Sequence, residues 1–219
     1  MTELSLLSEK LTGLQRGFFV AFEGIDGSGK STQIELLKSR LSAPVLYTRE
    51  PGGTKIGEEL RRLVMHGPHD VDAKTEALLY AADRASHVSS KIEPALAGGT
   101  SVVTDRFMDS SVAYQGLGRD LGAKSVKELS MWATGGLEPD LVIILDISPE
   151  LSSARTGPGR DRIENAGAEF RGTVRDYYLE CAEADPARYC VLDGSNSAEI
   201  VFDQVVSAFV HALEGKTST

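Results

Sequence analysis

A glycine-rich stretch near the N-terminus carries the residue types that bind the phosphates of a nucleotide. Gly24, Gly29, Lys30 and Ser31 match the pattern G-x-x-x-x-G-K-[ST]. In such a loop the glycines allow positive φ angles, so that backbone N–H groups turn toward an anion, while the lysine reaches the β- and γ-phosphates and the hydroxyl binds Mg²⁺. An apolar run over 18–22 precedes the loop and helical spacing follows it. The sequence therefore predicts a nucleoside triphosphate site.

Two aspartates at the ends of apolar runs are candidates to hold Mg²⁺ together with Ser31. Asp105 ends the run from 101 and is followed by Arg106, which suits an acceptor phosphate. Asp146 ends the run from 141, but the Ser-Pro-Glu sequence from 148 is typical of a helix start, so this aspartate could serve only that turn. A carboxylate at the end of a buried strand beside a phosphate loop is the usual holder of the metal ion, and we expect Asp105 in that role.

A turn after the second apolar run brings another arginine to the same edge. Arg49 ends this run, and Pro51 with two glycines forms a turn before Thr54, which can cap the next helix. The turn and the cap explain the proline, the glycines and the threonine but not the arginine. We therefore predict that Arg49 binds a ligand.

One long helix is predicted over residues 72–98, with Asp72 as its N-terminal cap and two glycines at its end. Tyr80, Arg84 and His87 lie on one stripe of this helix, at i, i+4 and i+7. The residues alone slightly favour a half-buried surface, in which Tyr80 packs and Arg84 pairs with a carboxylate. The alternative is a platform on which a base stacks, with a hydrogen-bonding arginine beside it.

A local cluster of positive charge lies in the C-terminal third of the chain. Its five arginines are Arg155, Arg160, Arg162, Arg171 and Arg175. Glycine and proline over 157–159 indicate a segment that could close over phosphates as a lid, which we expect around residues 154–170. A solvated helix with alternating charges is the alternative, and it suits the last two arginines better than the first two.

The elements that must position these residues alternate between apolar runs and segments with helical spacing. The five runs end near Gly24, Glu50, Asp105, Asp146 and Asp193. This alternation predicts an α/β fold of three layers, in which helices flank a five-stranded parallel sheet. Ligands bind such sheets beyond the carboxyl ends of the strands, where the residues named above lie.

Residues 1–16 are expected to form a helical extension ahead of a single domain over 17–219. Leu4, Leu7, Leu11 and Leu14 share one helical face, which we expect to pack on the body of the protein. These first residues lack the basic start and continuous apolar core of a signal peptide.

The composition argues against several classes of protein. A net charge of -9 is unlike that of a general nucleic-acid binder, whereas a small anionic ligand needs only a local basic cluster. No apolar stretch approaches the roughly 20 residues that span a bilayer, so we expect no membrane partner. The two cysteines, Cys181 and Cys190, are expected to be reduced thiols in a cytoplasmic protein.

Five motifs in order resemble those of bacterial thymidylate kinases (dTMP kinases), which are P-loop nucleoside monophosphate kinases. The motifs are FEGIDGSGKSTQ, TREPGGT, KTEALLYAADR, DRFMDSSVAYQG and DRIE, and the likeness extends from about residue 18 to 213. This resemblance implies a P-loop kinase domain over 17–219 that transfers the γ-phosphoryl group of ATP to dTMP with Mg²⁺, giving dTDP and ADP. It also implies a homodimer.

The resemblance assigns roles to single residues. The implied ATP site consists of Gly24, Asp26, Gly27, Ser28, Gly29, Lys30, Ser31, Thr32 and Asp193. The implied dTMP site consists of Asp26, Arg49, Glu50, Pro51, Tyr80, Arg84, Arg106, Ser111, Tyr114 and Gln115. In this site Tyr80 would lie under thymine and Arg84 would contact the base edge, which reverses the preference for a surface stripe. Tyr114 would crowd the 2′ position and so favour deoxyribose.

The implied catalytic residues are Lys30, Arg106, Arg155 and Arg160. In this family one subgroup places a catalytic arginine in the phosphate loop, while another supplies it from the lid. Positions 25–28 contain no arginine, so here the lid must supply it, from Arg155, Arg160 or Arg162. No general base is required, because a phosphate monoester with a second pKa of about 6 is mostly deprotonated at neutral pH. Two alternatives remain open: a kinase for another monophosphate such as dUMP or UMP, and a non-catalytic ATP-binding module.

Overall fold

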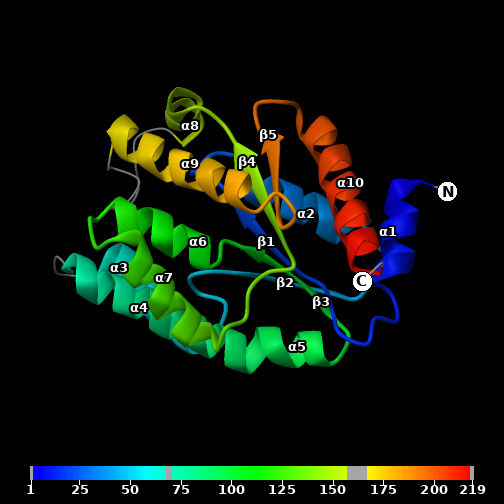
Figure 1. Cartoon of the computed structure of the whole chain (residues 1–219), viewed down its shortest axis with the longest axis horizontal. Helices are drawn as coiled ribbons and strands as arrows, with labels where there is room; N and C mark the ends of the chain where they lie inside the picture. Colours follow the sequence, from blue (N-terminus) through cyan, green and yellow to red (C-terminus); the bar gives the residue numbers. More distant parts are fainter. Residues whose placement is uncertain (1, 68–70, 157–166, 218–219) are drawn as a thin grey trace.

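Five parallel strands form the central sheet of the computed structural model, which describes residues 2–67, 71–156 and 167–217 (Figure 1). The strands are β1 Phe19–Glu23, β2 Val45–Arg49, β3 Ser101–Asp105, β4 Leu141–Asp146 and β5 Tyr189–Asp193. Their order across the sheet is β2-β3-β1-β4-β5. They coincide with the five apolar runs, so the predicted α/β fold with a five-stranded parallel sheet is confirmed.

Helices cover both faces of this sheet (Figure 1). The described α-helices are α1 Glu3–Leu11, α2 Lys30–Arg40, α3 Lys55–His66, α4 Ala73–His87, α5 Glu93–Ala97, α6 Met108–Ser111, α7 Ala123–Thr134, α8 Pro149–Thr156, α9 Gly167–Ala184 and α10 Ala198–Thr217. Two π-helices are η1 Val88–Ile92 and η2 Val112–Leu117. Each of the described helices is too short or too polar to span a bilayer.

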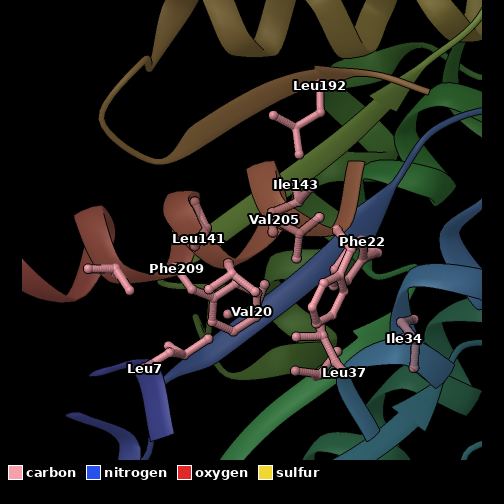
Figure 2. Close-up of a cluster of buried hydrophobic side chains, with 14 of the residues drawn as sticks. Leu7, Val20, Phe22, Ile34, Leu37, Leu141, Ile143, Leu192, Val205 and Phe209 are labelled. Carbon is pink, nitrogen blue, oxygen red and sulfur yellow. The ribbon is translucent and has the colours of Figure 1, made fainter. Parts of the chain in front are cut away.

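Alternation of side chains along the strands builds a core on each face. Val20 and Phe22 of β1 pack in one cluster with side chains of α1, α2 and α10 (Figure 2). Phe19 and Ala21 point to the opposite face, where η1 and α5 cover them. A further cluster on that face joins β4 to α9 and η2. Both faces of the sheet are therefore buried, as expected for parallel strands.

The register of the strands brings chemically active residues to one edge. Asp105 pairs with Phe22 of β1 on one side and with Arg49 of β2 on the other. Since the phosphate loop follows β1 directly, this register places Asp105 and Arg49 beside it. The sheet thus positions, at its carboxyl edge, side chains that are far apart in the sequence.

The N-terminal helix α1 packs against α10. Leu7 is fully buried in the cluster that Figure 2 shows, and Leu11 is fully buried in the same cluster. Lys10 forms an ion pair with Glu214 of α10 at 3.3 Å. The helix ends at Leu11, so the prediction that Leu14 continues its apolar face is wrong in detail. Leu14 still packs against the same cluster, because the chain turns back toward the sheet after Gly13, whose φ is +79°.

The single long helix predicted over 72–98 is interrupted. The structure has α4, then the π-helix η1, then α5, in one continuous helical run. Pro94 offers a physical reason, since a proline has no N–H to donate to the carbonyl four residues earlier, and the ladder shifts to a wider spacing just before it. The predicted cap is confirmed: the Asp72 carboxylate accepts hydrogen bonds from the N–H groups of Lys74 and Thr75.

Candidate active site

A cavity of about 870 Å³ at the carboxyl ends of the strands is lined by residues from both predicted sites, the ATP site and the dTMP site. The predicted site residues that line it are Asp26, Gly27, Gly29, Lys30, Ser31, Thr32, Arg49, Glu50, Pro51, Tyr80, Arg84, Asp105, Arg106, Ser111, Tyr114, Gln115 and Arg155. Gly24, Ser28 and Asp193 are not among its described lining residues. Gly24 and Ser28 instead contact the Lys30 ammonium, and Asp193 accepts hydrogen bonds from Ser195.

The phosphate loop has the backbone geometry that its glycines were predicted to allow. The φ angles of Gly24, Gly27 and Gly29 are +135°, +77° and +102°, values that favour glycine. The helix α2 begins at Lys30, so the positive end of its dipole lies at the loop. This combination of a glycine turn and a helix N-terminus is a general anion-binding arrangement.

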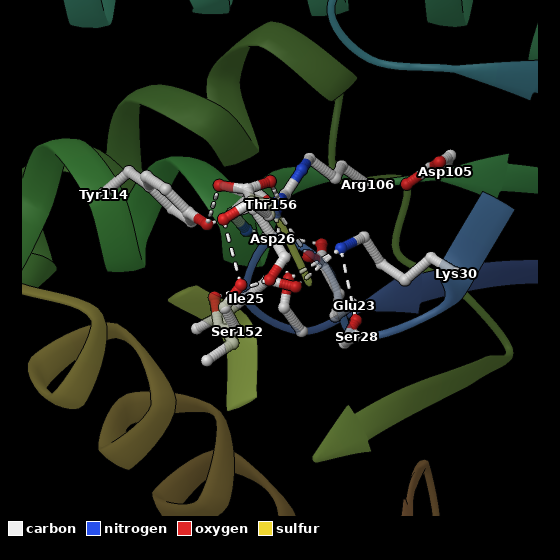
Figure 3. A network of polar contacts seen from close by, with 12 residues as sticks. Glu23, Ile25, Asp26, Ser28, Lys30, Asp105, Arg106, Tyr114, Ser152 and Thr156 are labelled. Atoms are coloured by element: carbon white, nitrogen blue, oxygen red, sulfur yellow. Dashed lines mark hydrogen bonds and ion pairs between the residues drawn. The ribbon is translucent and has the colours of Figure 1, made fainter. Parts of the chain in front are cut away.

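Lys30 is buried and folded onto the loop that precedes it. Its ammonium donates to the carbonyl oxygens of Gly24 at 2.9 Å and Ile25 at 3.1 Å (Figure 3). Burial, and then the nearby positive charge of Arg106, lowers the pKa of Lys30 to about 8, although Asp105 opposes this effect. A phosphate bound at the loop would favour the charged form of this lysine.

Arg106 connects the phosphate loop with the segment after β3. Its Nη2 atom donates to Asp26 Oδ1 at 2.5 Å and to the Tyr114 hydroxyl at 3.2 Å (Figure 3). Its Nη1 atom donates to Ser110 Oγ at 3.0 Å. Burial by itself would raise the pKa of Asp26, but Arg106, followed by Lys30, holds it below its ordinary range. The predicted residues Asp26, Arg106 and Tyr114 therefore form one network in the cavity wall.

Glu23, the last residue of β1, supports this network from behind, and sequence reasoning missed it. Its carboxyl group accepts hydrogen bonds from the Phe107 N–H at 2.9 Å, from Ser110 Oγ at 2.6 Å and from the Tyr178 hydroxyl at 3.0 Å. The side chain is fully buried, and burial, with Asp109 adding to the effect, raises the pKa of Glu23 to about 7. The sequence feature that could have indicated this role is a glutamate at the end of an otherwise apolar run, because a buried carboxyl group needs hydrogen-bond partners.

Ser31 and Asp105 have a geometry that fits Mg²⁺. Ser31 Oγ donates to Asp105 Oδ2 at 2.9 Å, and both residues line the cavity. Among the described residues, no group of three or more acidic, histidine or cysteine side chains could hold a metal ion by itself. Mg²⁺ usually binds to one or two protein oxygens together with substrate phosphates, so this hydroxyl and carboxylate suit it. The rival, Asp146, is engaged in a two-bond ion pair with Arg175, at 2.6 and 2.8 Å.

The stripe on α4 is not a half-buried surface. Arg84 and His87 are fully buried, and both bind the buried carboxylate of Glu50, at 2.8 Å and 2.9 Å. Arg84 does pair with a carboxylate, as the surface interpretation expected, but it also donates to Ser130 Oγ, the Phe107 carbonyl and Ser111 Oγ. Four of its five N–H groups therefore have protein partners.

Tyr80 is only partly buried and lines the cavity, as the base platform requires. The predicted ligand residue Arg49 is exposed and also lines the cavity. Arg61 and Asp83, which sequence reasoning missed, hold the turn between them: Arg61 donates to the Pro51 carbonyl at 3.1 Å, and Asp83 accepts from the Gly52 N–H at 3.1 Å.

Arg155 lies over the phosphate loop. Its Nη1 atom donates to the carbonyl oxygens of Gly27 at 3.2 Å and Gly194 at 3.0 Å. Arg171 instead donates to Ser153, and Arg175 binds Asp146, so these two arginines attach α9 to α8 and β4. Arg160 and Arg162 lie outside the described residues, as does most of the predicted lid.

The parallel sheet with a glycine-rich loop and a following helix at the end of β1 defines a P-loop nucleoside triphosphate-binding protein. Comparison with known proteins narrows this class. The family model for thymidylate kinase matches residues 22–205, and the chain belongs to the thymidylate kinase family.

The relatives and one solved structure agree with this membership. A thymidylate kinase of Bifidobacterium longum is 47% identical over 198 residues, which cover 87% of this chain and 96% of the relative. A thymidylate kinase of Leifsonia xyli is 48% identical over 195 residues, covering 86% and 92%. The crystal structure of thymidylate kinase from Ehrlichia chaffeensis matches with a TM-score of 0.72 and 32% identity, covering 88% of this chain and 98% of that one.

Proposed function

We infer that this protein transfers the γ-phosphoryl group of ATP to dTMP and forms dTDP and ADP. The observation that carries this conclusion is that the phosphate loop, Arg49, Tyr80 and Arg106 line the same cavity, in a chain of the thymidylate kinase family. A donor triphosphate and an acceptor monophosphate can be held there with their reacting groups together. Holding two reactants in this way removes much of the entropic barrier to their reaction.

In this proposal the donor site is the phosphate loop with Lys30 and Arg155. The loop N–H groups and the α2 N-terminus bind the phosphates, and the Lys30 ammonium exchanges its loop carbonyls for phosphate oxygens. Arg155, which reaches over the loop to the Gly27 carbonyl, stabilises charge on the transferred group. The segment around residues 154–170 is the proposed lid.

Ser31 and Asp105 would hold Mg²⁺ in this site, directly or through its bound waters. When bound, the ion supplies positive charge that neutralises phosphate oxygens during transfer. Asp105 also keeps the Ser31 hydroxyl oriented, because the hydroxyl donates a hydrogen bond to the carboxylate and leaves its oxygen lone pairs free.

The acceptor site is proposed to use Arg49 and Arg106 for the dTMP phosphate and Tyr80 for the base. Arg106 is already placed by Asp26 and Ser110, so it needs little ordering when the phosphate binds. The Glu50 carboxylate accepts a hydrogen bond from Arg84, so we propose that Glu50 acts by holding Arg84 in place rather than by contacting dTMP. The remaining N–H of Arg84 and the Ser111 hydroxyl are then available to the base edge.

The test is a panel of monophosphates in one coupled assay of ADP release, with ATP and Mg²⁺ in every reaction. We expect dTMP to be the best acceptor and UMP to be much poorer. Equal or faster turnover with UMP, CMP or AMP would contradict the dTMP assignment. ATP binding without turnover of any monophosphate would favour the non-catalytic module.

We further propose that two copies of the chain pair through α3, α4 and α7, and that the protein works in the cytoplasm. Leu78 of α4 is 52% exposed and Trp132 of α7 is 82% exposed, and α4 packs between α3 and α7. Large apolar side chains that face solvent on neighbouring helices mark interaction surfaces. Both cysteines are free thiols, as expected in a reducing compartment.

Light scattering during size-exclusion chromatography tests the dimer. Leu78→Glu should shift the native chain from dimer to monomer, because a charge would be buried in the interface. The matched control is Ile200→Glu on α10, which is 50% exposed on another part of the surface and should leave the dimer intact. A monomeric native chain, or a dimer that survives Leu78→Glu, would count against this interface.

A further inference from the structure

The amide of Gln115 is held in one orientation by a buried carboxylate. Gln115 Nε2 donates to Glu76 Oε1 at 2.9 Å, and the two side chains come from η2 and α4. Both residues are almost completely buried, with exposed fractions of 2% and 1%. A carboxylate can only accept, so the atom that faces it must be the amide nitrogen. The amide oxygen therefore points away from Glu76.

The charge of Glu76 is compensated from its other side. Arg119 Nη2 lies 3.5 Å from Glu76 Oε2. An arginine on one oxygen and an amide donor on the other give both oxygens of this buried carboxylate a partner. The pair Glu76 and Arg119 thus fixes which end of the Gln115 amide can reach a ligand.

The amide oxygen of Gln115 is available to the cavity. Gln115 lines the cavity together with Tyr80, Arg84 and Ser111, the residues proposed to surround the base. Within the described part of the chain, Oε1 of Gln115 has no hydrogen-bond partner, and it is not among the buried polar atoms that lack one. The site therefore presents an acceptor to a base that lies on Tyr80.

We propose that Glu76 is a positioning residue that sets base specificity by keeping the Gln115 carbonyl toward the cavity. Thymine and uracil present an N–H donor at N3, whereas cytosine presents a lone pair there, which the fixed carbonyl repels. A site with a fixed acceptor rejects a base that cannot donate, because both groups would be left unpaired. The proposal rests on the proposed function, since it requires the acceptor base to lie at Gln115.

The first test compares kcat/KM for dTMP and dCMP in the native chain and in Glu76→Gln. In the variant the facing amide can donate or accept, so Gln115 can rotate and present its NH₂ group to N3 of cytosine. We expect the ratio of kcat/KM for dTMP to that for dCMP to fall at least about tenfold, while KM for ATP stays nearly constant. An unchanged ratio would overturn the proposal.

A swapped pair keeps the test decisive even where the single variant folds poorly. In Glu76→Gln/Gln115→Glu the amide at position 76 donates to the carboxylate at 115, whose second oxygen again offers an acceptor to the cavity. The net charge is unchanged. We expect the double variant to keep the preference of the native chain for dTMP over dCMP, in turnover and in Kd from titration calorimetry. A double variant that folds but has lost this preference would contradict the orientation argument.

Gln115→Ala separates this inference from the function on which it rests. If Gln115→Ala leaves KM for dTMP unchanged, the base does not lie at Gln115, and both the acceptor-site assignment and the specificity proposal are wrong. If Gln115→Ala raises KM for dTMP but Glu76→Gln leaves the base preference intact, only the role of Glu76 is wrong.

Discussion

The buried carboxyl group of Glu23 should make the stability of this protein depend on pH. Burial, with the negative charge of Asp109, raises the pKa of Glu23 from its ordinary value of 4.5 to about 7. The folded protein then binds this proton more tightly than the unfolded chain, so the free energy of unfolding falls as pH rises from 4.5 to 7. At about 1.4 kcal/mol per pH unit, the loss from this group is about 3 kcal/mol.

Glu23→Gln should remove this dependence without emptying the site. The amide oxygen can still accept from the Phe107 N–H, and the NH₂ group can donate to the hydroxyls of Ser110 and Tyr178. At pH 5 we expect the variant to be less stable than the native chain by about 1 kcal/mol, the value of one altered hydrogen bond. At pH 8 we expect the order to invert, because only the native chain then holds a buried charge.

Thermal unfolding at pH 5, 6, 7 and 8, followed by circular dichroism, measures this effect. For a chain of this length, about 3 kcal/mol corresponds to a change in Tm of roughly 6–12 °C. Glu128→Gln, at an exposed position, is the control and should follow the native profile. A constant difference in Tm between the native chain and Glu23→Gln across the four pH values would refute the reasoning.

Three further predictions concern the lid, the base site and the N-terminal helix. Arg155→Ala should lower kcat by about 10²-fold or more with modest change in KM, because it removes a group that stabilises charge in the transition state. The control Arg171→Ala loses a contact to Ser153 and should leave kcat nearly unchanged. Equal losses of kcat in steady-state kinetics would contradict the assignment of Arg155. Arg84→Lys should raise KM for dTMP by about tenfold and KM for ATP much less, because lysine lacks the planar guanidinium that binds Glu50 and Ser111. An unchanged KM for dTMP would show that the role of Arg84 is only structural. Leu7→Ala should lower the free energy of unfolding in denaturant titration by about 2–5 kcal/mol, since Leu7 is fully buried. The control Ile200→Ala should change this free energy by less than about 0.5 kcal/mol. Similar losses in the two variants would show that α1 is not part of the core.

Residues close together in the sequence could be assigned without the structure. The phosphate loop was predictable because its glycine φ angles, its lysine and its helix start are set by a few consecutive residues. The five strands were predictable because each is a short apolar run that ends at a polar residue. The caps at Thr54 and Asp72 follow from the same local rules, and both are observed.

The partners of the two aspartates could not be predicted from local rules. Sequence reasoning preferred Asp105 over Asp146 from the residues that follow each of them. The structure adds the partners: Asp105 accepts from Ser31 across the sheet edge, and Asp146 is paired with Arg175 of α9. Neither partner follows from spacing, because β3 and α9 reach those positions only through strand order and helix packing.

The sequence by itself determined the fold class, the phosphate loop and, through its motifs, the family. Only the tertiary structure decided which polar groups are buried together: Glu23 beneath Arg106, Glu50 between Arg84 and His87, and Glu76 behind Gln115. A local pattern reports backbone conformation and which face is apolar. Pairing between side chains tens of residues apart depends on strand register and on how each helix lies on the sheet, and this is why the groups that orient the site were found only in three dimensions.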